Sequence, residues 1–232
     1  YFILPELINE STNKEKYYFN FFFTITMYIM WLWCWIITIA GDPGRTIDDL
    51  RDRGLLTRIQ RGDIPNSLRN IPICPECNLP RPRRAYHCTD CGYCHLRFDH
   101  HCVCTGDCIA DKNFKAFILS FLYGSLLGYS ISFPSGIYFF INHNNHQILT
   151  LFLWVYTFLL STLYLCFGIN FFSGGAESLA VVDQINNDKN NSKSRLWSTF
   201  GDKWWKKMIP LQKHTTAFAW PGVNWEDDNP II

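Results

Sequence analysis

The sequence lacks an excess of charge of either sign. Its 21 Lys and Arg residues nearly balance its 20 Asp and Glu residues, which leaves a formal net charge of +1. A nucleic-acid-binding chain usually carries a basic face or a basic recognition helix. Neither is visible in this sequence, so we expect no nucleic-acid partner.

Three long stretches lack any charged residue. They are residues 18–40, 116–141 and 148–172. A helix needs roughly 20 apolar residues to cross the hydrocarbon core of a bilayer, and a helix satisfies its own backbone hydrogen bonds there. The sequence therefore predicts three transmembrane helices. The short link between the last two, NHNNHQ, indicates an antiparallel hairpin.

That link also lacks Lys and Arg, which predicts a topology. The segment 41–115 carries twelve Lys and Arg residues, and the part after Phe172 carries seven. Because cytosolic loops are enriched in Lys and Arg, we expect residues 41–70 as a cytosolic linker, 71–115 as a cytosolic domain and 173–232 as a cytosolic tail. Residues 1–17 are then a lumenal or extracellular stub. The chain starts at Tyr1 rather than at methionine, so we expect that its N-terminus is missing.

Cysteine is scarce outside one segment. Eight of the ten cysteines fall between Cys74 and Cys108, with repeated CxxC spacing and histidines among them. CxxC pairs bind tetrahedral zinc through two thiolates, and the cytosol disfavours structural disulfides. Four prolines between positions 72 and 82 argue against regular helix. We therefore expect metal ions to hold this segment together.

The spacing alone leaves the use of these cysteines open. Two all-cysteine sites would consume all eight thiols and give a purely structural module. Two sites of three cysteines and one histidine would leave two thiols free. In that case Asp99, His100 and Cys102 have the residue types of nucleophilic catalysis, in which a carboxylate orients an imidazole that activates a thiol.

The segment resembles the DHHC-type cysteine-rich domain of protein S-palmitoyltransferases. The matching elements are the paired cysteines, Arg81-Pro82-Arg83, His87-Cys88, Asp99-His100-His101-Cys102, Cys108 and Asn113-Phe114. Asp42-Pro43-Gly44 follows the first apolar run, where that family carries its DPG motif. The resemblance implies a mainly α-helical integral membrane protein, with three spans in this chain and four in the full protein, and an irregular cytosolic domain with two structural zinc ions.

The resemblance also implies the ligands of each zinc ion. One would be bound by Cys74, Cys77, His87 and Cys94. The other would be bound by Cys88, Cys91, His101 and Cys108. Since four protein ligands leave no open coordination position, both ions would be structural.

The function implied by the resemblance is protein S-acylation. Cys102 would accept a fatty acyl group, palmitoyl in the first place, from acyl-CoA and pass it to cysteines of membrane-associated proteins in a ping-pong reaction, with His100 as general base oriented by Asp99. Arg81 and Arg84 would bind the CoA phosphates. The family occupies the ER, Golgi or plasma membrane. The alternative is a catalytically inactive, zinc-stabilised membrane scaffold.

Several positions depart from the family pattern or lack motif support. Val103 and Cys104 replace the usual Pro-Trp, and we expect Cys104 to be a small apolar filler rather than a second acyl acceptor. Only the glutamate of the family's Thr-Thr-x-Glu element remains, at Glu177. Residues 197–210 weakly resemble its C-terminal aromatic segment. The remaining expectations concern packing and exposure: the intramembrane thiols Cys34 and Cys166 pack, and four histidines face solvent or the interface, namely His95, His143, His146 and His214.

Overall fold

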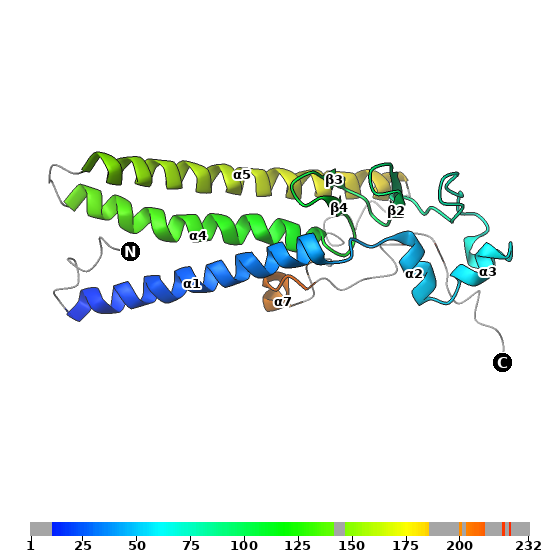
Figure 1. The fold of residues 1–232 in the computed structure, drawn as a ribbon, viewed down its shortest axis with the longest axis horizontal. Helices are drawn as coiled ribbons and strands as arrows, with labels where there is room; N and C mark the ends of the chain where they lie inside the picture. Colours follow the sequence, from blue (N-terminus) through cyan, green and yellow to red (C-terminus); the bar gives the residue numbers. More distant parts are fainter. Residues whose placement is uncertain are drawn as a thin grey trace. The chain divides into compact units, whose positions relative to one another are not determined.

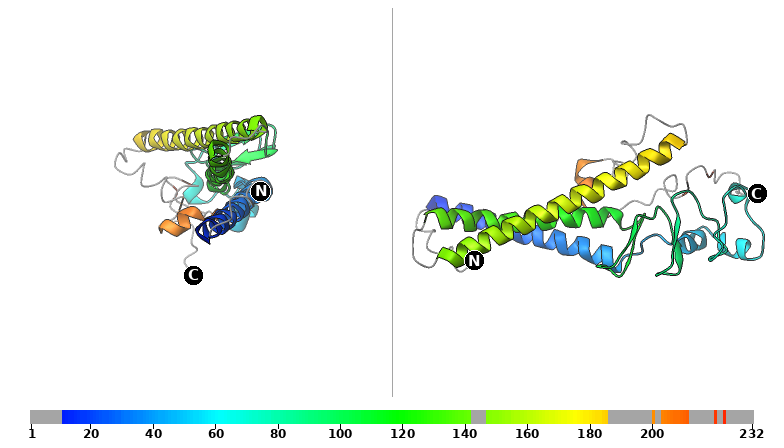
Figure 2. Two further views of the ribbon diagram at one scale, coloured as in Figure 1. Left: turned by 90° about the vertical axis from the view of Figure 1, so that its left-hand side faces the viewer. Right: turned by 90° about the horizontal axis from the view of Figure 1, so that it is seen from above.

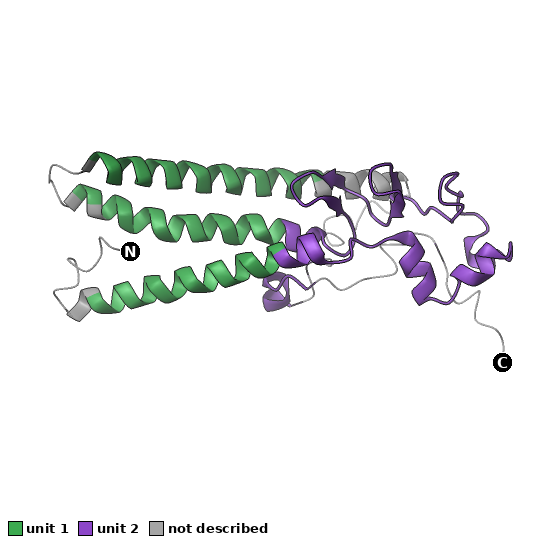
Figure 3. Cartoon of the chain, viewed as in Figure 1, with its two compact units in different colours: residues 1–35, 118–177 green, residues 36–117, 178–232 purple. Residues whose placement is uncertain are grey.

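The computed structural model describes residues 11–141, 147–185, 200, 203–211, 220 and 223. Within these ranges the side chains of 11–13, 138, 141, 147 and 175–185 are left undescribed. The chain divides into two compact units, shown in green and purple in Figure 3. Unit 1 comprises residues 1–35 and 118–177, and unit 2 comprises residues 36–117 and 178–232.

Most of each of three long helices lies in unit 1. These helices are α1 (Ser11–Ala40), α4 (Phe114–Ile141) and α5 (Gln147–Ile185). Each contains a stretch long and apolar enough to cross a membrane: Lys14–Ala40, Phe114–Ile137 and Ile148–Gly174. The helices lie side by side, and α5 crosses α4 obliquely (Figure 1, Figure 2). The sequence-based prediction of three membrane-capable helices is therefore confirmed. The helix α5 extends past Phe172, where the apolar run ends, as far as Ile185.

Small residues let α4 and α5 approach closely. A Cβ atom added at Gly124 would lie 2.3 Å from the Tyr164 ring, and one at Gly128 would lie 1.9 Å from the Ser161 hydroxyl. Close contact through glycine is typical of helix pairs in membranes, where lipid offers no hydrophobic driving force between helices. Many large apolar side chains point outward, as in Phe19 at 74% exposure. Such a surface suits a lipid environment.

Apart from the ends of the three long helices, the elements of unit 2 that the structure describes are short (Figure 1). The first three are helical, α2 (Thr46–Asp52), α3 (Leu56–Gln60) and the 3₁₀ helix η2 (Asn66–Leu68). Strands β1 (Tyr86–Cys88) and β2 (Tyr93–His95) form one antiparallel hairpin, and β3 (His100–Cys102) and β4 (Asp107–Ile109) form another. The short helix α7 spans Trp204–Met208.

The apolar core of unit 2 is small, and it includes a tryptophan from the C-terminal part of the chain. Its buried members are Leu50, Leu55, Leu56, Ile59, Leu68, Leu79, Ala85, Leu96 and Trp220. The indole N–H of Trp220 donates to Asp49 at 2.5 Å. Strands of three residues cannot hold a fold by themselves, so other interactions must fix the two hairpins.

Candidate metal and thiol site

The first hairpin sends neighbouring residues to opposite faces. His87 pairs with Cys94 and Cys88 pairs with Tyr93 across the ladder. Because side chains alternate along a strand, His87 and Cys88 point in opposite directions. Gly92 makes the turn between the strands with a φ of 73°, a conformation that favours glycine.

On one face lies the first cluster, formed by Cys74, Cys77, His87 and Cys94. Its four candidate ligand atoms all lie within 4.8 Å of one another. The His87 Nδ1 atom is 3.2 Å from the Cys77 sulfur and 3.9 Å from the Cys94 sulfur.

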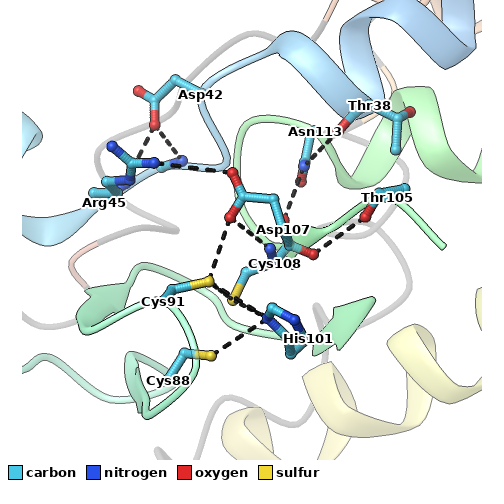
Figure 4. Close-up of polar contacts among 11 residues, drawn as sticks. Thr38, Asp42, Arg45, Cys88, Cys91, His101, Thr105, Asp107, Cys108 and Asn113 are labelled. Carbon is cyan, nitrogen blue, oxygen red and sulfur yellow. Dashed lines mark hydrogen bonds and ion pairs between the residues drawn. The ribbon is translucent and has the colours of Figure 1, made fainter. Parts of the chain in front are cut away.

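The second cluster joins the first hairpin to the second. It consists of Cys88, Cys91, His101 and Cys108, again with all ligand atoms within 4.8 Å (Figure 4). The His101 Nδ1 atom lies 3.5 Å from the Cys88 sulfur, 3.4 Å from the Cys91 sulfur and 3.7 Å from the Cys108 sulfur. Since His87 and Cys88 are adjacent but belong to different clusters, the two clusters interleave.

Both clusters fit a divalent metal ion by their chemistry. Three thiols and one imidazole are a common donor set for tetrahedral zinc, with Zn–S near 2.3 Å. Burial and neighbouring thiols raise the pKa of Cys91 to about 11 and raise the pKa values of Cys94 and Cys108. Crowded buried thiols of this kind resist ionisation unless a cation stabilises the thiolates. The two groups can therefore hold metal ions.

The second hairpin separates the thiol Cys102 from the metal cluster. In β3, His101 pairs with Cys108, and Cys102 pairs with Asp107. Alternation along the strand places His100 and Cys102 on one face and His101 on the other. Among the described residues, no group of side chains able to hold a metal includes Cys102.

A carboxylate and an aromatic ring position His100. The Asp99 carboxylate accepts a hydrogen bond from His100 Nδ1 at 2.9 Å, and the Phe117 ring packs edge-on at a centroid distance of 5.4 Å. The hydrogen bond to Asp99 raises the pKa of His100, against the opposing effect of burial. Because Nδ1 is used by Asp99, Nε2 is the nitrogen left to act on the thiol.

Hydrogen-bond donors surround the thiol of Cys102, a residue that is 8% exposed. Burial opposes its ionisation. Hydrogen bonding by the Thr105 side chain, the His100 imidazole and the backbone N–H groups of Thr105 and Cys104 outweighs burial, so the pKa of Cys102 is lowered. The Thr105 hydroxyl also donates to the carbonyls of Cys102 and Asp107, at 3.1 and 3.2 Å. A thiolate is the nucleophilic form of cysteine, and this environment favours it.

Thr105 was not singled out from the sequence, and it gives a testable prediction. We expect Thr105→Val to slow acylation of Cys102 by roughly tenfold near neutral pH, because a hydrogen bond to a charged group contributes about 1.5–3 kcal/mol. The defect should shrink at higher pH, where the thiol ionises without help. Acylation rates measured across a pH series check this, with exposed Thr57→Val as the control. An unchanged pH profile in Thr105→Val contradicts the role.

The DPG loop, Asp42-Pro43-Gly44, is bonded to the second hairpin and its flanks. The Asp42 carboxylate accepts from the Gly44 N–H at 2.8 Å and from the Lys112 ammonium at 2.6 Å. Gly44 adopts a φ of 100°, which favours glycine. Its carbonyl accepts the Leu96 N–H at 2.8 Å. The loop therefore fixes the chain between the two hairpins.

Asn113 connects the second hairpin to helix α4. Its side chain is fully buried. The Oδ1 atom accepts from the Ala110 N–H at 2.8 Å, and Nδ2 donates to the Cys108 carbonyl at 2.9 Å and to the Thr38 carbonyl at 3.4 Å (Figure 4). One amide thus satisfies three backbone groups and holds the end of β4 against the first turn of α4.

Lys115 forms a second buried anchor, which the sequence did not reveal. It is 1% exposed, and its ammonium donates to the carbonyls of Phe200, Lys206 and Leu211 at 2.7–3.0 Å. A buried charge is stable only when it is well partnered. These contacts fix the segment around α7 to the start of α4.

We expect Lys115→Met to release that C-terminal segment. The substitution preserves the length of the side chain but leaves three carbonyls without their donor, at a cost of about 1–3 kcal/mol for each buried group. Limited proteolysis should cut the C-terminal segment much faster than in the native protein. The matched control is Lys203→Met, at an exposed position. Equal cleavage of both variants would show that the anchor is dispensable.

Of the next sequence-based expectations, one stays a prediction and two are wrong. Arg81 and Arg84 are half-buried, and Arg84 adopts a φ of 69°; their binding role stays a prediction. The expectation for Cys104 as an apolar filler is wrong, because its side chain is exposed. The expectation that His95 faces solvent is also wrong, since His95 ends β2 and is 0% exposed.

Further expectations concern residues in the membrane-capable helices and in the C-terminal part of the chain. Cys34 is buried as expected, whereas Cys166 is exposed on α5. His143, His146 and His214 lie outside the described residues, as does the side chain of Glu177.

Unit 1 contains an apolar groove of about 570 Å³. It lies among all three helices, and its lining includes Trp31, Trp35, Leu127, Leu160, Tyr164 and Phe167. Ligand sites commonly have volumes of roughly 300–1,000 Å³. The groove is large enough for an apolar chain.

These features define a protein with membrane-capable helices and a domain that contains two Cys/His clusters able to hold metal ions. The sequence model described as DHHC palmitoyltransferase matches residues 69–193, more than half of the 232 residues. This chain belongs to the DHHC palmitoyltransferase family.

Curated relatives agree with this assignment. The chain is 29% identical over 109 residues to palmitoyltransferase pfa3 of Aspergillus fumigatus, covering 44% of this chain and 20% of that protein. It is 47% identical over 62 residues to palmitoyltransferase ZDHHC23 of Mus musculus, covering 25% and 15%. It is 41% identical over 70 residues to palmitoyltransferase ZDHHC9 of Bos taurus, covering 30% and 19%. The chain thus spans a fifth or less of the length of these relatives.

Proposed function

We propose that this chain is a protein S-acyltransferase that moves a palmitoyl group from acyl-CoA through Cys102 to cysteines of other proteins. The observation that carries the proposal is the local arrangement in β3. The strand turns His101 toward a metal cluster and leaves Cys102 beside His100, with Asp99 bonded to the imidazole at 2.9 Å. A metal-bound thiol would be unavailable for this chemistry.

Zinc is the metal proposed for both clusters, with the eight cluster residues as its ligands. When bound, zinc would supply structural support rather than Lewis-acid chemistry, since four protein ligands leave no open position. Its effect on the reaction is indirect. By holding both hairpins, the ligands keep His100 and Cys102 on the same face of β3.

The first chemical step forms an acyl-enzyme. His100 Nε2 takes the proton of the Cys102 thiol, and the thiolate attacks the thioester carbonyl of acyl-CoA. The bond between that carbonyl and the CoA sulfur breaks, and the CoA thiolate receives the proton from His100. Asp99 keeps the imidazole oriented and stabilises its charged form.

The second step repeats the exchange with a substrate cysteine. His100 takes the proton of the incoming thiol, the new thiolate attacks the Cys102 thioester, and Cys102 leaves as a thiolate that recovers the proton. Both steps exchange one thioester for another, so little free energy is lost. This is a ping-pong scheme.

The two halves of acyl-CoA have different chemical requirements. The apolar groove of unit 1 suits the acyl chain, for which each buried CH₂ contributes about 0.8 kcal/mol. Arg81 and Arg84 are the proposed partners of the CoA phosphates, because Arg offers fork-like donors to phosphate. The Lys/Arg distribution supports a cytosolic location for residues 41–115 and 173–232. Substrate proteins would then carry cysteines at the cytosolic membrane surface.

The test is transfer of palmitoyl from palmitoyl-CoA to a lipid-anchored peptide that carries one cysteine. Native protein in detergent or nanodiscs should release CoA and produce a hydroxylamine-sensitive acyl-peptide. Cys102→Ser should lose both products, while Cys104→Ser, which preserves the backbone N–H, should retain them. If native protein with its metal bound produces neither, the chain is the inactive scaffold.

A further inference from the structure

His95 is a buried histidine without a hydrogen-bond partner. It closes β2 at 0% exposure, and neither Nδ1 nor Nε2 has a hydrogen-bond partner. Buried polar groups are nearly always paired, and leaving one unpaired costs free energy. The first hairpin therefore contains a buried imidazole that needs a partner.

The imidazole of His95 lies against the second cluster. Candidate ligand atoms of Cys91, His95, Asp107 and Cys108 all lie within 4.8 Å of one another. Cys91 and Cys108 already belong to the second cluster, and their sulfurs are 3.4 Å apart. His95 and Asp107 are the added members, one from each hairpin.

The Asp107 carboxylate points toward the shared thiols (Figure 4). Its Oδ1 atom lies 3.5 Å from the Cys91 sulfur and accepts the Cys108 N–H at 2.7 Å. Its Oδ2 atom lies 3.9 Å from the Arg45 guanidinium. One carboxylate oxygen of Asp107 therefore already lies beside a sulfur atom of the second cluster.

We propose that a further divalent cation of the zinc type binds to four residues, namely Cys91, His95, Asp107 and Cys108. The ion would share both thiolates with the ion of the second cluster and form a thiolate-bridged pair. Zinc accepts this mixture of sulfur, nitrogen and oxygen ligands in tetrahedral geometry. The proposal rests on the ligand set proposed above for the second cluster.

Negative charge remains at this place when one ion is bound. The three thiolates of the second cluster and the Asp107 carboxylate carry four negative charges, against two positive charges on the ion and one on the Arg45 guanidinium, which lies 3.9 Å from the carboxylate. The group therefore still attracts a further cation.

The alternative is that His95 binds no metal and instead donates hydrogen bonds to the thiolates that hold a single ion. That arrangement needs no further metal. The two cases differ in metal content, which is independent of enzymatic activity.

The test is metal analysis of the purified chain reconstituted with Zn²⁺ and freed of loose ions by gel filtration. Native protein should hold about three ions per chain, whereas His95→Val and Asp107→Asn should each hold about two. Asp107→Asn retains an acceptor for the Cys108 N–H and keeps the shape of the side chain. The matched control is Asp90→Asn, an exposed carboxylate between the ligands Cys88 and Cys91, which should still hold about three.

Cobalt gives a second readout that does not depend on stability of the variants. In native protein loaded with Co²⁺, two ions bridged by thiolates should couple magnetically and weaken the paramagnetic signal per ion. Native protein with two uncoupled ions overturns the proposal, although it leaves the ligand set of the second cluster and the proposed transferase intact. Three ions in native protein and in both variants also overturn it, because the additional ion then binds elsewhere.

Discussion

His100→Ala is expected to slow acylation of Cys102 by about 10²–10⁴-fold, the range over which a positioned general base acts. The metal content should remain that of the native protein, because His100 lies on the face of β3 opposite to the second cluster. Single-turnover acylation from palmitoyl-CoA and metal analysis of the same sample check both statements.

The neighbouring residue provides the contrast. His101→Ala should lose bound metal and fold poorly, since its Nδ1 atom lies within 3.4–3.7 Å of three sulfurs. The two substituted residues are neighbours in the sequence, but their side chains lie on opposite faces of β3. If His100→Ala lost metal, or if His101→Ala kept its metal and lost only activity, the assignment of faces would be wrong.

Removal of metal is expected to have the largest structural effect. Structural zinc sites contribute apparent binding free energies of about 10–16 kcal/mol, and the strands of unit 2 have only three residues each. A membrane-permeant chelator should therefore make residues 71–115 accessible to protease and abolish acylation. The helical circular dichroism signal should persist, because the helices of unit 1 satisfy their own backbone hydrogen bonds.

The control for chelation is readdition of Zn²⁺ under reducing conditions, which should restore both protection and acylation. Because adjacent residues such as His87 and Cys88 serve different clusters, protection should be lost across both hairpins together. Protease resistance and full acylation in metal-free protein would contradict a structural role for the ions.

The sequence predicted the large features because each depends on a simple local pattern. Three charge-free runs predict three membrane-capable helices, and the structure contains them. The cysteine spacing predicts metal sites but leaves the ligand sets open. The structure brings together the two groups of four residues that the family resemblance implied, and alternation along β1 and β3 gives the physical reason for the grouping.

Long-range contacts could not be predicted from local patterns. The contact of Lys115 with carbonyls around α7 joins parts of the chain separated by 85 or more residues. The donors around Cys102 depend on the turn after β3, in which Thr105 and Gly106 both bond to the Cys102 carbonyl. The expectation of an exposed His95 is wrong because polarity alone suggests exposure, whereas its place at the end of β2 buries it beside the second cluster.

The most direct measurement of the central claim is intact-mass and peptide mass spectrometry under conditions that preserve bound metal. After brief exposure to palmitoyl-CoA, native protein should gain one palmitoyl group, mapped to Cys102, with no loss of metal. Acyl adducts found on Cys104 or on a cluster cysteine while Cys102 remains a free thiol, or acylation that appears only after metal is lost, would contradict the account.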